Sequence, residues 1–269
     1  GLLVVMVLLW VPESLPAERR HDGGLRILLD GTRELARDHV LVRLLFINAL
    51  SFGLLMAYLS AAPFVLRNVL GMGTVAYTAV FGLCGATVTV TIGVAASLVR
   101  RFSQARQVWV GLIVGLIVDV VFAAVCLTRL RAPVEGGERT VLLVVVTALF
   151  LAHVACLGLS LGNAPALALD RTGRWAGTGS ALLGFLQFVV GGLVSPLVGL
   201  SGEASGAAFG VVIVVIGVIA NALAALGLHG RSPEAPRGAS AWIHMRCEMT
   251  AANRRRLWPR LKGMNPWCW

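Results

Sequence analysis

The sequence predicts an all-α membrane protein, a bundle of six transmembrane helices. Six apolar runs follow one another along the chain, and each is about the twenty residues that a helix needs to cross ~30 Å of hydrocarbon. Apolar residues make up 57% of the chain and charged residues 13%, whereas soluble domains average ~45–50% and ~25%. The predicted spans are 41–66, 75–99, 108–127, 141–161, 176–200 and 207–228.

The rest of the chain divides into three predicted parts around the transmembrane domain at 41–228. Residues 1–11 are predicted to be the end of a truncated transmembrane helix, because this apolar stretch is too short to span and no basic segment precedes it. Residues 12–40 form a long basic loop, predicted to be the cytoplasmic central loop, and 229–269 form a basic tail that is predicted to be disordered. The alternative for the tail is a polybasic segment that lies on anionic lipid.

Apolar residues recur at helical spacing within the loop, and charged residues occupy the other faces. This pattern is typical of an amphipathic helix at the membrane surface, and an ordinary solvated linker is the alternative. The apolar positions are Leu25, Leu28, Leu29, Leu35 and Ala36.

Basic residues gather in alternate connections between the spans. The net charge is +10. Most of the arginines lie in the loop before the first span, in the connections at 100–107 and 162–175, and in the tail. Because basic segments are retained in the cytoplasm, both ends of the six-span domain are predicted to be cytoplasmic. The connection at 128–140 is the exception, since Arg129, Arg131 and Arg139 fall on the predicted outer side.

One span carries an acidic residue near its centre. Asp119 continues a stripe of small residues with Gly111 and Gly115, so it is expected to face packed protein rather than lipid. An ionisable side chain at this depth costs ~2.5–3.5 kcal/mol on insertion scales and is therefore a functional candidate. Asp119 is the candidate for proton coupling, and a hydrogen-bonded structural acid is the alternative.

Uncharged or titratable polar side chains in other spans are candidates for substrate binding. They would orient a partly polar ligand in an apolar pocket, or else bond a neighbouring helix; His153 would also titrate near neutral pH. Asn221, beside Gly217, is predicted to bond between helices. The polar candidates are Asn48, Ser51, His153 and Gln187, and Phe52 is a further candidate that would supply aromatic contact or else pack in the core.

Signatures of enzymes are absent from the sequence. It contains no GxxxxGK[ST] loop for ATP, no HExxH and no GxSxG. The cysteines show no CxxC spacing, so neither a disulfide framework nor a metal site is expected. Because the arginines lie in short segments between apolar runs, nucleic-acid binding is not expected. No enzyme activity and no cofactor are predicted.

Four stretches resemble the major facilitator superfamily of transporters. The segment 10–15 resembles the Pro-Glu-Ser/Thr signature that closes their sixth helix, and 59–66 resembles the end of the seventh helix in the Bcr/CflA drug-resistance subfamily. The most specific stretch, 163–187, resembles the junction of helices ten and eleven in that subfamily. Arg100-Arg101-Phe102 resembles a reduced form of the basic turn between helices eight and nine.

This resemblance implies that residues 1–228 are the C-terminal half of a twelve-helix multidrug efflux transporter in the bacterial inner membrane. Such proteins confer antibiotic resistance by exporting small, partly apolar drugs in exchange for protons, so the energy source is the proton gradient. The implied partners are a drug-like molecule, protons, membrane lipid and a missing N-terminal half. The alternative is a non-transporting six-helix assembly or scaffold protein, or a decayed transporter half.

Overall fold

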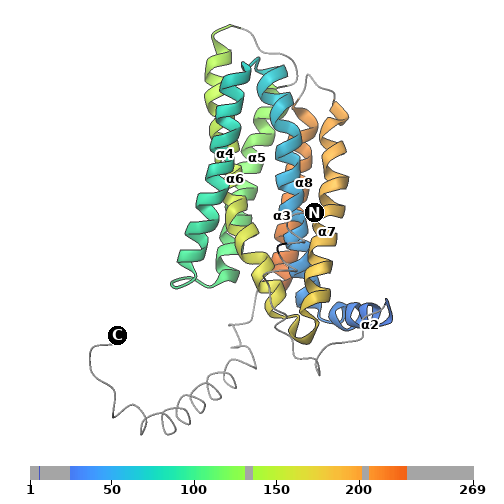
Figure 1. Cartoon of the computed structure of the whole chain (residues 1–269). Helices are drawn as coiled ribbons and strands as arrows, with labels where there is room; N and C mark the ends of the chain where they lie inside the picture. The colour runs from blue at the N-terminus through green and yellow to red at the C-terminus, as the bar shows by residue number, and fades with distance from the viewer. Residues whose placement is uncertain (1–5, 7–24, 131–135, 202–205, 229–269) are drawn as a thin grey trace, which may run out of the picture. The chain divides into compact units, whose positions relative to one another are not determined.

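The computed structural model describes residues 6, 25–130, 136–201 and 206–228. Over these residues the chain folds into helices without strands, and the long helices run up and down beside one another (Figure 1). Six of them are long and apolar enough to cross a membrane, so the predicted fold class is confirmed. The spans are α3 (His39–Pro63) with η2 (Phe64–Val69), α4 (Thr74–Leu98), α5 (Gln104–Arg129), α6 (Glu138–Asp170), α7 (Ala176–Val198) and α8 (Ala207–Leu228). Short 3-10 turns, η3 (Gly173–Trp175) and η4 (Gly199–Ser201), flank α7.

Local residue chemistry sets where the helices begin and end. The Asp38 carboxylate accepts hydrogen bonds from the N–H groups of Val40 and Leu41 and so begins α3, as an N-cap does. Ser103 caps α5 in the same way through the Arg106 N–H. The α-helix of the first span gives way to a π-helical turn directly after Pro63, which has no backbone N–H to donate.

Glycines allow the helices to approach one another closely. A Cβ atom at Gly191 of α7 would lie 2.8 Å from the Met56 side chain of α3, and one at Gly210 of α8 would lie 3.0 Å from the Ala123 backbone of α5. Helices in lipid gain no hydrophobic drive from association, so close packing at small residues must stabilise them. The small residues therefore act as contact points between helices.

Three phenylalanines join α5, α6 and α8 in the core. The rings of Phe122, Phe150 and Phe209 are buried, with centroids 4.8 to 5.8 Å apart, and Tyr58 of α3 packs edge-on against Phe150 at 5.3 Å. Such pairs contribute ~0.5–1.5 kcal/mol each beyond the burial of their area. This aromatic cluster links four of the six spans through direct ring contacts.

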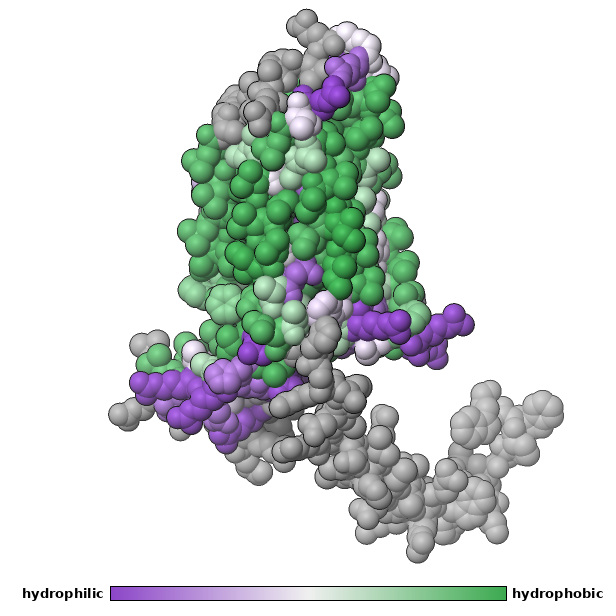
Figure 2. Space-filling model, turned by 180° about the vertical axis from the view of Figure 1, so that it is seen from behind, coloured by the Kyte–Doolittle hydropathy of each residue, from purple (hydrophilic) through white to green (hydrophobic). Residues whose placement is uncertain are grey.

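Apolar side chains cover the outer surface between the two ends. On the face seen in Figure 2, hydrophobic residues form a broad band and hydrophilic residues gather at its ends. The exposed apolar side chains include Val75 and Val90 of α4, and Phe188 and Leu193 of α7. Such a surface suits hydrocarbon on its lipid-facing parts.

The predicted amphipathic helix is present as α2 (Leu25–Ala36). It lies across the lower end of α3 and α7 in Figure 1, and a Cβ atom at Gly31 would lie 2.7 Å from the Trp175 ring. Two ion pairs join this part of the chain to the α6–α7 connection: Glu34 with Arg174 at 2.6 Å, and Asp38 with Arg171 at 2.8 Å. Its position at a membrane surface stays a prediction.

Two arginines near the connection between α5 and α6 have local partners. The Arg129 guanidinium pairs with Glu138. The Arg139 Nε donates to the Leu70 carbonyl at 2.8 Å, and its Nη2 donates to the Gly71 carbonyl. These contacts give two of the three exceptional arginines a structural role, whereas Arg131 lies outside the described residues. So do the predicted helix end at 1–11 except residue 6, the predicted loop from 12 to 24, and the predicted tail at 229–269.

Replacing Gly210 with leucine should destabilise the bundle by ~1–3 kcal/mol, because the new side chain would overpack the contact with Ala123. The matched control is Gly85→Leu on α4, where a Cβ atom meets nothing within 4 Å and leucine improves helix propensity. Unfolding in mixed micelles would measure both. Equal stability of the two variants would contradict the close approach of α5 and α8.

Contact of α2 with the bundle should depend on pH. The hydrogen bond from Arg174 holds the pKa of Glu34 below its usual value. Partial burial acts to raise the pKa of Asp38, but hydrogen bonds from the Leu41 N–H and Arg171 outweigh it and lower that pKa. A lowered folded-state pKa means that the stabilisation is complete above ~pH 4, the ordinary carboxylate range, and is lost as the pH falls through the folded-state values.

A spin label at Leu29, which is 60% exposed, should therefore gain mobility when the pH is lowered below ~4. The double variant Glu34→Gln, Asp38→Asn should show the mobile spectrum already at neutral pH, while the new asparagine side chain retains the capacity to cap α3. A label whose mobility responds neither to acid nor to these substitutions would show that the ion pairs do not anchor α2.

Candidate functional site

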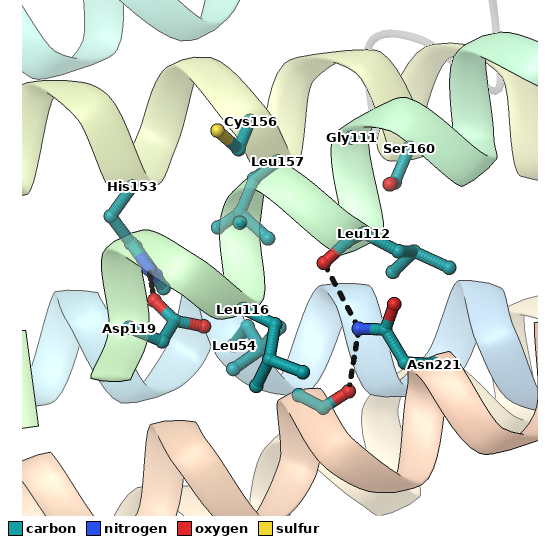
Figure 3. A pocket seen from close by; sticks show the side chains of 12 residues that line it. Leu54, Gly111, Leu112, Leu116, Asp119, His153, Cys156, Leu157, Ser160 and Asn221 are labelled. Carbon is teal, nitrogen blue, oxygen red and sulfur yellow. Dashed lines mark hydrogen bonds and ion pairs between the residues drawn. The ribbon is translucent and has the colours of Figure 1, made fainter. Parts of the chain in front are cut away.

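The structure brings together two of the predicted site residues, Asp119 and His153. Asp119 Oδ1 lies 2.5 Å from His153 Nδ1, and the side chains are 2% and 0% exposed. Figure 3 shows the pair between α5 and α6. Sequence analysis proposed each residue separately, Asp119 for protons and His153 for substrate, and the structure places them in one hydrogen bond.

The glycine stripe of α5 allows this contact. A Cβ atom at Gly111 would lie 3.0 Å from the Cys156 carbonyl and 3.1 Å from the Ser160 Oγ, and one at Gly115 would lie 3.4 Å from the Cys156 Cβ. The α5 and α6 backbones therefore run close together on the side of Asp119 that carries the stripe. As predicted, Asp119 faces packed protein.

A small cavity adjoins the pair between α3, α5, α6 and α8. Its volume is about 10 Å³, close to the ~10–15 Å³ needed to hold one water molecule and far below the ~300–1,000 Å³ of a drug-sized pocket. The cavity is therefore not a drug site in this conformation. It is lined by Leu54, Gly111, Leu112, Gly115, Leu116, Asp119, His153, Cys156, Leu157, Ser160, Gly217 and Asn221.

Polar atoms of three helices meet at this cavity. As predicted, Asn221 of α8 bonds to another helix: its Nδ2 donates to the Leu112 carbonyl of α5 at 2.9 Å, and also to the Gly217 carbonyl of its own helix at 2.9 Å. His153 Nε2 and Ser160 Oγ are buried and have no hydrogen-bond partner within the described part of the chain. A Cβ atom at Gly217 would lie 3.4 Å from Asp119 Oδ2, so α8 covers this side of the carboxylate.

The pair has the chemistry to hold a proton inside an apolar bundle. If Asp119 is ionised, the imidazole donates its Nδ1 proton to it; if the carboxyl is protonated, the same nitrogen accepts. A proton can therefore move between Nδ1 and Oδ1 without breaking the hydrogen bond. Because each side chain is the other's buried hydrogen-bond partner, the protonation state of one is coupled to that of the other.

The remaining predicted substrate residues lie elsewhere. Asn48 and Ser51 of α3 are fully buried, and their side-chain polar atoms have no partner among the described residues. Phe52 of α3 packs edge-to-face against Phe188 of α7 at 5.6 Å. Gln187 of α7 is half-buried. Their role in substrate binding stays a prediction.

A second buried polar pair, Gln107 and Asn163, was not predicted from the sequence. Asn163 Nδ2 donates to Gln107 Oε1 at 3.2 Å, and Asn163 and Gln107 are 2% and 4% exposed. One signal was available, because Gln107 precedes Gly111 by four residues and so continues the stripe of α5 toward the start of that helix. The pair lies between α5 and α6, as Asp119 and His153 do.

These features define a multi-pass membrane protein with a buried ionisable pair. Residues 1–196 match the Major Facilitator Superfamily, and the chain belongs to this family of membrane transporters. Over 230 residues it is 28% identical to the Uncharacterized MFS-type transporter YdgK of Bacillus subtilis (strain 168), an alignment that covers 84% of this chain and 53% of that protein. The chain thus spans about half the length of the curated relative it matches. No solved structure matches it.

Replacing His153 with leucine should destabilise the bundle by ~3–5 kcal/mol at neutral pH, because Asp119 would be left buried without its hydrogen-bond partner. The double variant Asp119→Leu, His153→Leu should recover most of this loss, since both buried polar groups are removed. Unfolding by denaturant in bicelles would measure the cycle, with Cys156→Ala as a control on the same cavity wall. Additive losses would show that the pair is not coupled.

Proposed function

We propose that this chain is the C-terminal half of a Bcr/CflA-type multidrug efflux transporter, which exports small, partly apolar molecules in exchange for protons. The observation that carries the proposal is the Asp119–His153 pair in the core of a chain from a transporter family. Asp119 lies near the middle of α5, where an ionisable side chain is expensive. A transport cycle that requires a proton-binding group would account for the presence of Asp119 in the apolar core.

The proposed partner is an N-terminal half of the same fold. The matched relative is about twice as long as its alignment with this chain, and transporters of this kind bind substrate between two pseudo-symmetric halves. Glycines on α4 and α7 leave open surface for such a partner, because a Cβ atom at any of them meets nothing within 4 Å. These glycines are Gly82, Gly85, Gly93, Gly184 and Gly192.

The proposed drug contacts lie on α3 and α7. Phe52 and Gln187 keep exposed surface, and the neighbouring ring of Phe188 is largely exposed, so this face offers aromatic contact and one amide to a partly apolar ligand. Asn48, Ser51 and His153 are buried and are proposed to reach substrate only when the helices rearrange during alternating access.

The proposed location is the bacterial inner membrane with the α2 end of the bundle in the cytoplasm. Arg100, Arg101, Arg171 and Arg174 belong to connections at this end, and basic residues are retained on the inner side. Six crossings then bring the chain back to the same side after α8. The C-terminus is accordingly proposed to be cytoplasmic.

Replacing Asp119 with asparagine should abolish proton coupling while leaving expression intact, because the amide cannot release a proton at this site. Ethidium efflux would be measured in cells that express the chain together with an N-terminal half. The wild type should lower dye accumulation, and a proton uncoupler should reverse this effect. Asp119→Asn should leave accumulation as high as in cells without the protein.

The matched control is Asp30→Asn, which makes the same substitution on the exposed surface of α2 and should transport normally. Normal uncoupler-sensitive efflux by Asp119→Asn would remove this residue from the mechanism. Accumulation that neither the wild type nor an uncoupler changes would count against antiport and favour a non-transporting membrane assembly.

A further inference from the structure

Buried polar side chains occur at intervals between the Asp119–His153 pair and one end of the bundle. We call this set the α5–α6 polar seam, and its side chains are Gln107, Asn163, Ser160, His153 and Asp119. Gln107 lies twelve residues before Asp119 on α5, so the seam extends ~18 Å along the helix at 1.5 Å per residue. It spans about half the thickness of a bilayer.

The outer end of the seam reaches the surface. Gln107 Nε2 donates to the Phe102 carbonyl at 3.2 Å, and Phe102 lies in the exposed turn between α4 and α5. The Arg106 guanidinium lies over the Phe102 ring at 5.1 Å. Water therefore has access to the Phe102 turn, while the Gln107–Asn163 pair one turn further inward is buried.

The inner end of the seam is the cavity beside Asp119 and His153. Two buried polar atoms at this cavity, Ser160 Oγ and His153 Nε2, have no protein partner within the described ranges. A buried polar atom without a hydrogen bond costs ~1–3 kcal/mol, and the cavity volume of about 10 Å³ is close to that of one water site. The cavity is thus a candidate site for one water molecule.

The packing of α5 against α6 does not by itself require the polar side chains of the seam. The other α5 residues on or beside this contact, Val108 and Leu112, are apolar and buried, and the close approach of the backbones needs only the glycines. Gln107 and Asn163, at 4% and 2% exposure, bond to each other and to the carbonyls of Phe102 and Leu159. Each side-chain carbonyl oxygen has a second lone pair that can accept from water.

We propose that the seam is the route by which the Asp119–His153 pair exchanges its proton with water at the α2 end of the bundle. Water is the co-reactant: a proton from the Phe102 end passes through water held by Gln107, Asn163 and Ser160 to His153 Nε2. The imidazole then gives its Nδ1 proton to Asp119 Oδ1, and the reverse sequence returns it. This inference deepens the proposed function, on which its biological purpose rests.

The groups that face the pair limit which side chains take part. Cys156 is the other titratable side chain that lines the cavity, and α3 and α8 contribute Leu54, Gly217 and Asn221 to it. Arg106 at the mouth of the seam has its guanidinium over the Phe102 ring, away from the cavity lining. Proton exchange at the cavity is therefore expected to report on Asp119 and His153.

The test measures the exchange of the His153 ring proton with water. The full chain would carry ¹⁵N-histidine in lipid nanodiscs, and His153→Gln would assign the signal. The double variant Gln107→Leu, Asn163→Leu removes both partners of the outer pair together, which avoids an orphaned amide. It should slow exchange at least about tenfold and leave the midpoint of the His153 titration unchanged, because a route alters rates and not the equilibrium.

The matched control is Ser60→Ala with Ser195→Ala, which removes a polar pair between two other helices, α3 and α7, at 2.6 Å, and should leave the rate unchanged. If the leucine variant does not fold, Ser160→Ala replaces it and should slow exchange several-fold. Equal rates in wild type and seam variants, equal slowing by the control, or a His153 signal that never exchanges would overturn the inference.

Transport assays separate this inference from the proposed function. Seam-dependent exchange in a protein that shows no proton-coupled efflux would refute the antiport proposal and leave the route in place. Proton-coupled efflux with exchange that is indifferent to Gln107 and Asn163 would refute the route alone.

Discussion

The close approach of α5 and α6 is the constraint on which the rest of this site depends. In lipid, two helices are held together by contact between their backbones and small side chains rather than by hydrophobic burial. Gly111 and Gly115 present no side chain to α6, so the Cys156 carbonyl lies where a Cβ atom at Gly111 would be crowded. Only at this separation does the short Asp119 side chain reach the His153 ring.

Burial makes the two members of the pair interdependent. Each removes the other from a costly isolated state in a medium of low polarity, and Gly217 and Asn221 of α8 close the cavity beside them. A change in the proton content of the pair would therefore affect α5 and α6, which carry it, and α3 and α8, which line the same cavity. A single protonation step could in this way bias the arrangement of a largely apolar bundle.

Much of the fold was predictable from the sequence, but less of the site. The six spans and the helix before them follow from runs and periodicities that act locally, and the resemblance to major facilitator transporters is confirmed over residues 1–196. Asp119 and His153 were identified as candidates because ionisable residues in hydrocarbon are costly. Their pairing was not predicted, nor was the burial of Asn48 and Ser51, because a helical pattern gives a face and not the neighbour it meets.

The sequence by itself determined that the chain is helical and how it is cut into spans, since the transfer of each segment into lipid and the satisfaction of its backbone hydrogen bonds are properties of that segment alone. Tertiary structure decided which polar groups meet. Asp119 and His153 are 34 residues apart, and Asn221 is 109 residues from the carbonyl it binds. Those contacts depend on how separate helices pack, through small differences in distance that hydropathy does not encode.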